Sequence, residues 1–168
     1  MQPKLQRITP FLWFDTQAEE AARFYTQIFE RSRIGNITHY DPEVTKISGH
    51  PAGAVMTVAF ELEGQPFYAL NGGPHAKFTQ AISFVVNCDT QQEVDRYWQR
   101  LSEGGDPQAQ MCGWLKDRFG LSWQIVPRQM FEFLHDPDTN RGRRAMLALM
   151  QMKKLDLRTL QEAADARG

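Results

Sequence analysis

Two apolar runs, each followed by a helical pattern, divide the sequence into similar halves. The first run, 8–14, ends at Asp15, and the second run, 82–88, ends at Asp89. Each aspartate is followed by Thr-Gln, and each threonine is followed three residues later by a glutamate, which predicts a capping box at the start of each helix. The two copies are 74 residues apart. That spacing is too long for a solenoid repeat and indicates two copies of one small module.

The rest of the pattern predicts one strand, one helix and three further strands in each half. In the first half we expect a helix over 17–30, a loop over 41–53, and strands over 8–14, 34–40, 55–62 and 66–70. In the second half we expect a helix that stops at Gly104-Gly105, and strands over 82–88, 108–111, 113–116 and 121–126. Asn71-Gly72-Gly73-Pro74 is the clearest break, so the modules span about 1–73 and 74–127 of one domain, 1–127.

The pattern changes beyond Pro127, where residues 128–168 form a predicted helical tail. Asp138 and Asp156 can each cap a helix. Methionines and leucines recur from Met146 to Leu160. Such a stripe must cover either the protein's own sheet or a partner subunit, and we expect a homodimer that uses this tail.

Composition is typical of a soluble globular protein. Of the 168 residues, 42% are hydrophobic and 23% charged, with a formal net charge of −1. A balanced charge argues against nucleic acid as a partner, because phosphate binding needs a basic surface. The chain shows no apolar stretch typical of a signal peptide or a membrane helix, and its two cysteines form no CxxC motif. We therefore expect a cytoplasmic protein with no membrane partner.

Several local strings resemble the PhnB-like branch of the vicinal oxygen chelate superfamily, which includes glyoxalase I, extradiol dioxygenases and bleomycin-resistance proteins. The most specific is CGWLKDRFGLSWQIVP, from Cys112 to Pro127, and others are LNGGP at 70–74, AISF at 81–84 and MQMKKLD at 150–156. This branch is often labelled "3-demethylubiquinone-9 3-methyltransferase domain". The resemblance implies an α+β fold in which two tandem βαβββ modules form a curled mixed β-sheet cavity with outer helices. It also implies a homodimer.

The resemblance also indicates where a metal would be bound, with ligands from the first and last strands of each module. The family pattern places a ligand four residues after a glycine, which gives Tyr68 after Gly64 and Gln124 after Gly120. The first strands contribute Thr9, or alternatively Phe11, and the internal repeat carries Thr9 onto Ser83. None of these residues is a histidine or a carboxylate, so we expect no catalytic metal and no cofactor.

Strand periodicity defines which residues face the cavity. If Thr9 and Ser83 face it, every second residue of their strands does too. The helix side is then formed by Ile8, Leu12 and Phe14 in the first module and by Ile82, Phe84 and Val86 in the second. The predicted ligand-binding residues are Thr9, Phe11, Trp13, Tyr68, Ser83, Asn87 and Gln124. Trp123 is then a core residue, and Trp114, if it lies opposite Trp123, is core as well. We found no Arg or Lys on these strand faces, so the expected ligand is a small organic molecule with little or no charge, held between the two modules.

Other residues with chemical potential have simpler explanations. We expect the four histidines to lie at the surface or in caps, namely His39, His50, His75 and His135. The charged residues Lys116-Asp117-Arg118, Glu61 and Glu63 lie at predicted hairpin turns, where side chains are usually solvated. No glycine pair opens a helix after a strand, as a methyl-donor site would require.

Two main functional hypotheses follow, and no catalytic residue is assigned. The first is a small-molecule-binding protein that lacks the standard metal ligands. The alternative is an enzyme, such as a glyoxalase-like lyase or isomerase, using a metal held by other ligands, or Tyr68 or a nearby histidine as acid or base. A structural dimer with a vestigial cavity is a third possibility.

Overall fold

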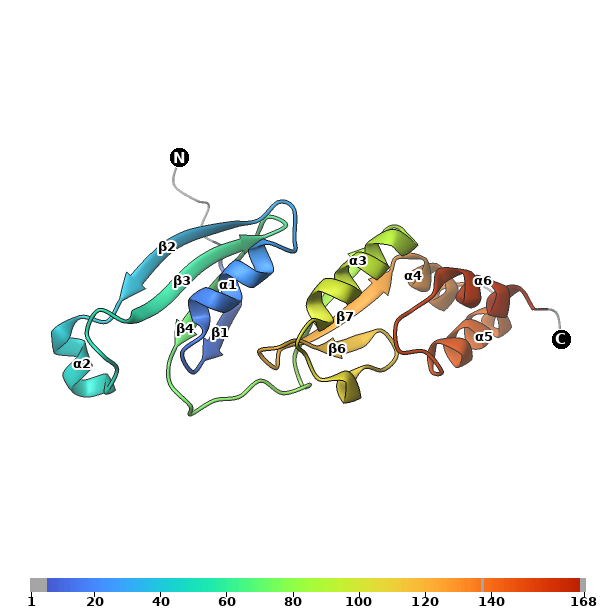
Figure 1. Cartoon of the computed structure of the whole chain (residues 1–168). Coiled ribbons are helices and arrows are strands. Elements are labelled where there is room, and N and C mark those ends of the chain that lie inside the picture. Colours follow the sequence, from blue (N-terminus) through green and yellow to red (C-terminus); the bar gives the residue numbers. More distant parts are fainter. Residues whose placement is uncertain (1–5, 137, 167–168) are drawn as a thin grey trace. The chain divides into compact units, whose positions relative to one another are not determined.

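The computed structural model describes residues 6–136 and 138–166, and its backbone contacts divide the chain into two compact units with a boundary between Lys77 and Phe78 (Figure 1). Both units repeat one arrangement. A first strand leads into a helix, and the last strand of a hairpin returns parallel to the first strand. The duplication expected from the repeated sequence pattern is therefore present in the fold.

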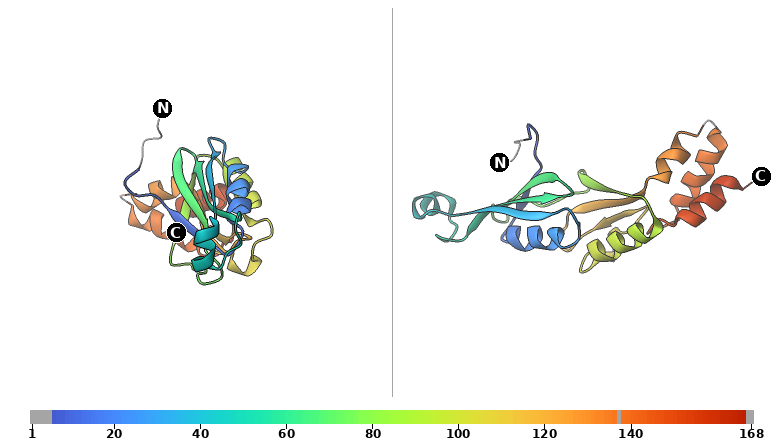
Figure 2. Two further views of the ribbon diagram at one scale, coloured as in Figure 1. Left: turned by 90° about the vertical axis from the view of Figure 1, so that its left-hand side faces the viewer. Right: turned by 90° about the horizontal axis from the view of Figure 1, so that it is seen from above.

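Unit 1 is a four-stranded mixed sheet with a helix along one face (Figure 2). Its elements are β1 (Phe11–Phe14), α1 (Ala18–Thr26), β2 (Arg33–His39), α2 (Pro42–Ser48), β3 (Val55–Leu62) and β4 (Gln65–Asn71). The strand order is β1-β4-β3-β2, with β1 parallel to β4 and the other pairs antiparallel.

The core of unit 1 lies between α1 and the sheet. Leu12 and Phe14 are buried there, as the alternation predicted. The ring of Phe60 in β3 stacks on Tyr25 of α1 and on Phe67 of β4, with centroids 6.3 and 5.3 Å apart. The intervening residues of β1 point to the opposite side of the sheet. We call that side, away from α1, the distal face of unit 1.

Two predictions in unit 1 are wrong for identifiable reasons. The first strand is shorter than 8–14, because Pro10 has no N–H to donate, and Ile8 is 84% exposed. The expected loop over 41–53 contains α2. The Asp41 side chain accepts a hydrogen bond from the Glu43 N–H at its start, and Gly49, with φ +76°, ends it in the left-handed region.

Unit 2 has a three-stranded sheet, in the order β5-β7-β6, and the second helix of the repeat packs on it. Its first elements are β5 (Ser83–Cys88), α3 (Gln91–Ser102), a 3-10 helix (Pro107–Ala109), β6 (Trp114–Lys116) and β7 (Ser122–Pro127). The Thr90 side chain accepts from the Glu93 N–H, so the second predicted capping box is confirmed. The expected strand over 108–111 is wrong, because Asp106 and Pro107 begin a 3-10 turn instead.

The sheet of unit 2 buries one of the two tryptophans that were expected in its core. Trp123 is buried between the sheet and α3, as predicted. Trp114 does not lie in this core, because its cross-strand partner is Gln124, whereas the partner of Trp123 is Leu115. Trp114 therefore points to the side away from α3, which we call the distal face of unit 2.

The tail is helical and packs within unit 2. It comprises α4 (Gln129–Leu134), α5 (Thr139–Leu149) and α6 (Leu157–Asp165), and Asp138 and Asp156 cap α5 and α6 as predicted. Its apolar residues form a cluster of their own, made of Met130, Phe133, Ala145, Leu155, Leu160 and Ala164, with Val126 packed against it. In two backbone hydrogen bonds of 2.8 Å, the Cys112 N–H donates to the Met152 carbonyl and the Gly113 N–H donates to the Lys153 carbonyl. The sequence left open whether the tail covers its own sheet or a partner subunit. In the structure the tail covers part of its own unit.

Candidate functional site

Three aromatic side chains lie together on the distal face of unit 1. Phe11 and Tyr68 are neighbours across the parallel pair β1 and β4, and their rings stack with centroids 5.7 Å apart and planes 19° apart. Trp13 follows on the same face of β1. The exposed fractions of Phe11, Trp13 and Tyr68 are 57, 37 and 36%. Unit 1 therefore brings together three of the predicted ligand-binding residues and leaves them accessible.

Trp13 is held in place by the segment that the sequence marked as a break. Its indole Nε1 donates a 2.9 Å hydrogen bond to the Gly73 carbonyl. A Cβ on Gly72 would lie 2.3 Å from two carbons of the indole ring. The glycines of Asn71-Gly72-Gly73-Pro74 thus let the indole approach the backbone closely.

The structure separates Thr9 from Phe11, the two alternatives for one site position. Thr9 precedes β1, and its hydroxyl donates a long hydrogen bond of 3.4 Å to the Gln6 carbonyl. Phe11 is the residue directly beside Tyr68. The position next to Tyr68 is therefore occupied by an aromatic ring.

One charged pair lies on the distal face of unit 1, contrary to expectation. Arg33 and Glu61 are cross-strand partners in β2 and β3, and the guanidinium lies 2.8 Å from the carboxylate. Glu61 was expected to be merely solvated, but it compensates this arginine. Glu63, at the hairpin turn, binds Arg31 in the same way at 2.9 Å.

The distal face of unit 2 carries the remaining predicted residues. The Gln124 amide donates a 2.8 Å hydrogen bond to the Ser83 hydroxyl, so these two residues are in direct contact. Val85 is the cross-strand partner of Gln124, and Asn87 is exposed farther along β5. Ser83, Asn87 and Gln124 thus share one face, as strand periodicity predicted.

Two residues of this face were missed. Trp114 and Lys116 in β6 are the cross-strand partners of Gln124 and Ser122 in β7, so their side chains share the face of Gln124. The prediction that no Lys or Arg lies on these faces is therefore wrong. The signal was present in the sequence, since Leu115 is the aliphatic residue of the short strand and its neighbours must point the other way.

The hairpin turn beside Lys116 is not solvated as expected. Asp117 is 2% exposed, and its carboxylate accepts hydrogen bonds from the N–H groups of Phe119 and Leu121, at 2.9 and 3.0 Å. The other carboxylate oxygen accepts from the Trp123 indole at 2.8 Å. Asp117 is a structural residue that fixes this turn.

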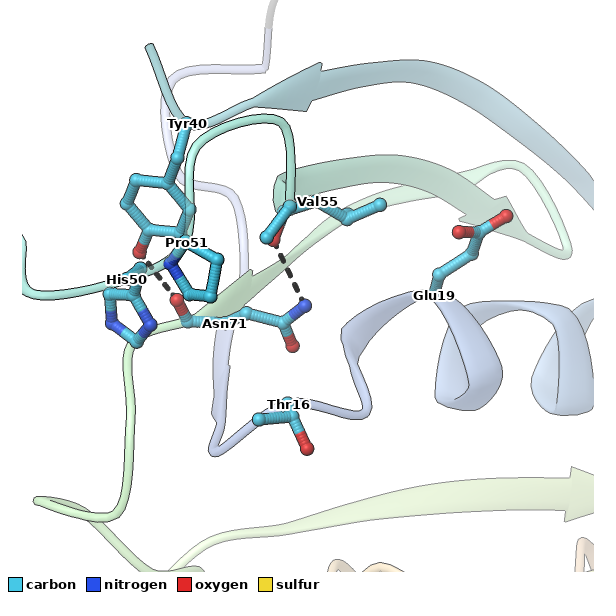
Figure 3. A pocket seen from close by; sticks show the side chains of 8 residues that line it. Thr16, Glu19, Tyr40, His50, Pro51, Val55 and Asn71 are labelled. Carbon is cyan, nitrogen blue, oxygen red and sulfur yellow. Dashed lines mark hydrogen bonds between the residues drawn. The ribbon is translucent and has the colours of Figure 1, made fainter. Parts of the chain in front are cut away.

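Unit 1 also contains a pocket of about 300 Å³ at the N-terminal end of α1 (Figure 3). It is lined by Thr16, Glu19, Tyr40, His50, Pro51, Ala54, Val55 and Asn71. Figure 3 shows Tyr40 and His50 together on one side of it, with their rings stacked 4.6 Å apart. The Tyr40 hydroxyl donates to the Asn71 carbonyl at 2.5 Å, and burial raises the pKa of this phenol.

Asn71 takes the role that the sequence assigned to Thr16. Its side-chain oxygen accepts from the Ala18 N–H at 2.7 Å, and its amide donates to the Val55 carbonyl at 3.1 Å. Thr16 forms no cap, because the helix begins after Gln17 without a side-chain cap of its own. The first predicted capping box is therefore wrong.

The histidines do not gather into one cluster. His39 and His135 are exposed, as expected, whereas His50 is partly buried in the pocket wall. His50 and His75 both lie close to Gly73. A ring carbon of each would be 3.4 and 3.5 Å, respectively, from a Cβ placed on Gly73. In the described part of the chain, no three His, Cys, Asp or Glu side chains are placed to hold one metal ion. No helix there is long and apolar enough to cross a membrane.

Comparison with known proteins connects this fold to one family. The family model described as 3-demethylubiquinone-9 3-methyltransferase matches residues 6–126. A PhnB protein from Bacillus cereus is 35% identical, with a TM-score of 0.61, and the match covers 73% of this chain and 99% of that one. A protein from Pseudomonas aeruginosa at 22% identity shares the fold, with a TM-score of 0.55 over 73% of this chain and 98% of its own. The search of curated proteins found no match.

Proposed function

The chain belongs to the 3-demethylubiquinone-9 3-methyltransferase family, the PhnB-like branch of the vicinal oxygen chelate superfamily, and from this we propose that it binds a small organic molecule containing an aromatic ring. The residues that bind it lie on the distal face of unit 1. The observation that carries the proposal is the stacked pair Phe11 and Tyr68, with Trp13 beside it, all three accessible on the face of the sheet opposite α1.

Three neighbouring aromatic side chains on one accessible face favour a ligand over a purely structural role. Aromatic residues contribute most to stability when they are buried, and contiguous exposed apolar surface on a soluble protein commonly marks a binding site. Phe11 and Tyr68 offer a flat surface against which a planar ring can stack. The bond from Trp13 to Gly73 fixes the third ring, which lowers the entropy cost of binding.

The distal face of unit 2, taken by itself, is a second candidate binding surface and carries neutral hydrogen-bonding groups. Asn87 is exposed, and the Ser83 hydroxyl keeps its own proton available because it accepts from Gln124. A pocket for an organic ligand typically combines apolar walls with a few polar groups that orient the molecule. The distal face of unit 2 offers both kinds by itself, because Val85 and Trp114 are the cross-strand partners of Gln124 there.

Methyl transfer is not part of the proposal, although the name of the family model contains it. In this chain Gly72 and Gly73 support the Trp13 indole, and Gly104 follows the end of α3 with φ +73°. Both glycine pairs therefore have structural roles. The glyoxalase-like alternative expected from the resemblance remains a prediction.

We propose further that the protein is a homodimer in the cytoplasm. Phe131, Leu134, Leu147 and Met150 are exposed apolar residues of the tail, and burying them against a second copy would remove them from water. Light scattering during size-exclusion chromatography tests this. A monomeric mass at micromolar concentration would contradict the dimer, and the binding proposal would be unaffected.

Ligand-observed NMR with a panel of small aromatic compounds tests the binding proposal. We expect phenols and benzamides to bind the wild-type protein, and Tyr68→Ala and Phe11→Ala to abolish binding while the protein stays folded. Ile47→Ala, which removes an exposed apolar side chain from α2, outside the distal face and the tail, is the control and should bind normally. Failure of every compound to bind the folded protein, or full binding by Tyr68→Ala, would contradict the proposal.

A further inference from the structure

Three side chains form a row across the sheet of unit 2. Ser122 in the central strand β7 is the cross-strand partner of Ser83 in β5 and of Lys116 in β6. Partners in adjacent strands point to the same face, with Cβ atoms about 5 Å apart. Two hydroxyls and one ammonium group therefore lie side by side on the distal face.

Both hydroxyls have a proton to donate. The Ser83 oxygen already accepts from the Gln124 amide at 2.8 Å. Ser122 is 1% exposed, and its hydroxyl oxygen, fully buried, has no hydrogen-bond partner among the described residues. A buried hydroxyl without a partner is destabilising by about 1–3 kcal/mol, and folded proteins rarely retain one without a purpose.

Lys116 supplies a positive charge that no carboxylate of the described residues compensates. The ion pairs of this part of the chain are formed by other residues, such as Arg118 with Glu103 and Lys154 with Asp95. On the distal face of unit 1, by contrast, Arg33 is neutralised by Glu61. Ser83 and Lys116 are partly exposed, so a ligand can reach these two residues from solvent, with the buried Ser122 between them.

We propose that Ser83, Ser122 and Lys116 form an oxyanion subsite and that the ligand of this protein carries a carboxylate or a phosphoryl group. Three aligned donors, one of them charged, match the acceptor-only oxygens of such a group. The adjacent row, Val85, Gln124 and Trp114, offers an apolar and aromatic surface to the rest of the molecule. This inference rests on the proposed function, that the ligand contains an aromatic ring, and it concerns the distal face of unit 2 taken by itself.

Isothermal titration calorimetry with benzoate, phenylphosphonate and benzamide provides the test. We expect the wild-type protein to bind the two anions more tightly than benzamide. Lys116→Gln should weaken binding of the anions by about tenfold or more, because a charge-assisted hydrogen bond is lost, and should leave benzamide binding nearly unchanged. Lys153→Gln, which removes an exposed lysine outside the sheet, is the control with the same change of charge.

Ser122→Ala separates a binding role from a structural one. If the hydroxyl serves the ligand, its removal weakens anion binding and leaves the thermal midpoint unchanged or higher, since an unsatisfied buried group has gone. A lower midpoint with unchanged anion affinity would overturn the assignment of Ser122.

The outcomes also distinguish this inference from the proposed function. Equal affinity for benzamide and benzoate, or anion binding that Lys116→Gln does not weaken, would overturn the oxyanion subsite and leave the aromatic-ligand proposal standing. Absence of binding by all three compounds would overturn the subsite, and the wider aromatic panel would then decide the proposed function.

Discussion

The indole nitrogen of Trp123 donates a 2.8 Å hydrogen bond to the buried carboxylate of Asp117, six residues earlier in the chain. The same carboxylate accepts from the N–H groups of Phe119 and Leu121. One side chain thus fixes the turn between β6 and β7 and anchors the largest core residue of the sheet. The turn sets the register that places Lys116 beside Ser122 and Trp114 beside Gln124.

We expect Asp117→Ala to lower the free energy of unfolding by about 2–4 kcal/mol, because three donors, two of them buried, lose their acceptor. Trp123→Ala should cost about 3–5 kcal/mol through the cavity that it leaves. Urea titration followed by circular dichroism measures both changes. Glu20→Ala removes an exposed carboxylate from α1 and should change stability by less than about 0.5 kcal/mol. An effect of Asp117→Ala as small as that of Glu20→Ala would refute the structural role.

Asn71 and Thr16 provide a second contrast, because sequence and structure assign the cap of α1 to different residues. Asn71→Ala removes the acceptor for Ala18 and the donor to Val55, and should cost about 2–3 kcal/mol. Thr16→Ala should cost less than about 0.5 kcal/mol, since its hydroxyl caps nothing. Thermal unfolding of both variants provides the comparison. A larger loss for Thr16→Ala than for Asn71→Ala would restore the capping box.

These contrasts show which features local sequence can predict. The alternation of Leu12 and Phe14 with Phe11 and Trp13 was readable because a strand has a period of two and one face must be buried. The cap of α1 could not be predicted in this way, because Asn71 lies 53 residues from Ala18 and only tertiary structure brings them together.

The candidate site was predicted only in part. Ser83 and Gln124 were found through the internal repeat and the spacing from Gly120. Trp114 was assigned to the wrong face because it was paired with Trp123, whereas the turn that Asp117 fixes pairs Trp114 with Gln124 and Leu115 with Trp123. The helix α2 was missed although Asp41-Pro42 and Gly49 are normal start and stop signals, because two prolines and two glycines favoured a loop.

Gly72→Ala tests whether the close approach of the backbone positions Trp13. The new methyl group would stand 2.3 Å from the indole ring, so the ring must move and lose its bond to Gly73. We expect the indole N–H signal of Trp13, assigned in NMR spectra through Trp13→Phe, to shift strongly. Binding of aromatic probes should weaken as well. An unshifted signal would mean that the indole position does not depend on Gly72.

We expect the purified protein to carry no stoichiometric Zn, Ni, Fe or Mn. The reason is the set of side-chain atoms at the four positions where the resemblance would place metal ligands. Phe11, beside Tyr68, has no donor atom, and Ser83 and Gln124 offer only neutral oxygen atoms. Divalent transition metals prefer imidazole, thiolate and carboxylate ligands. Elemental analysis measures the content. One metal ion per chain that disappears in Gln124→Ala would contradict the prediction and favour the enzyme hypothesis.

The attachment of the tail to α3 is expected to weaken in acid. The side chains of Lys154 and then Gln91 donate hydrogen bonds to Asp95, and together they hold the pKa of this carboxyl below its ordinary value of 3.8. A depressed carboxyl pKa contributes stability at any pH above the ordinary value, and this contribution is lost as the pH falls through the pKa of the folded state.

Asp95→Asn, which keeps the shape and removes the charge, isolates this contribution. The readout is amide hydrogen exchange at Leu157, whose N–H donates to Gln91 at 2.8 Å. At about pH 7 we expect stronger protection in the wild-type protein than in the variant, and at about pH 3 the two should approach each other. A difference in protection that is equally large at both pH values would show that the charge of Asp95 does not hold the tail.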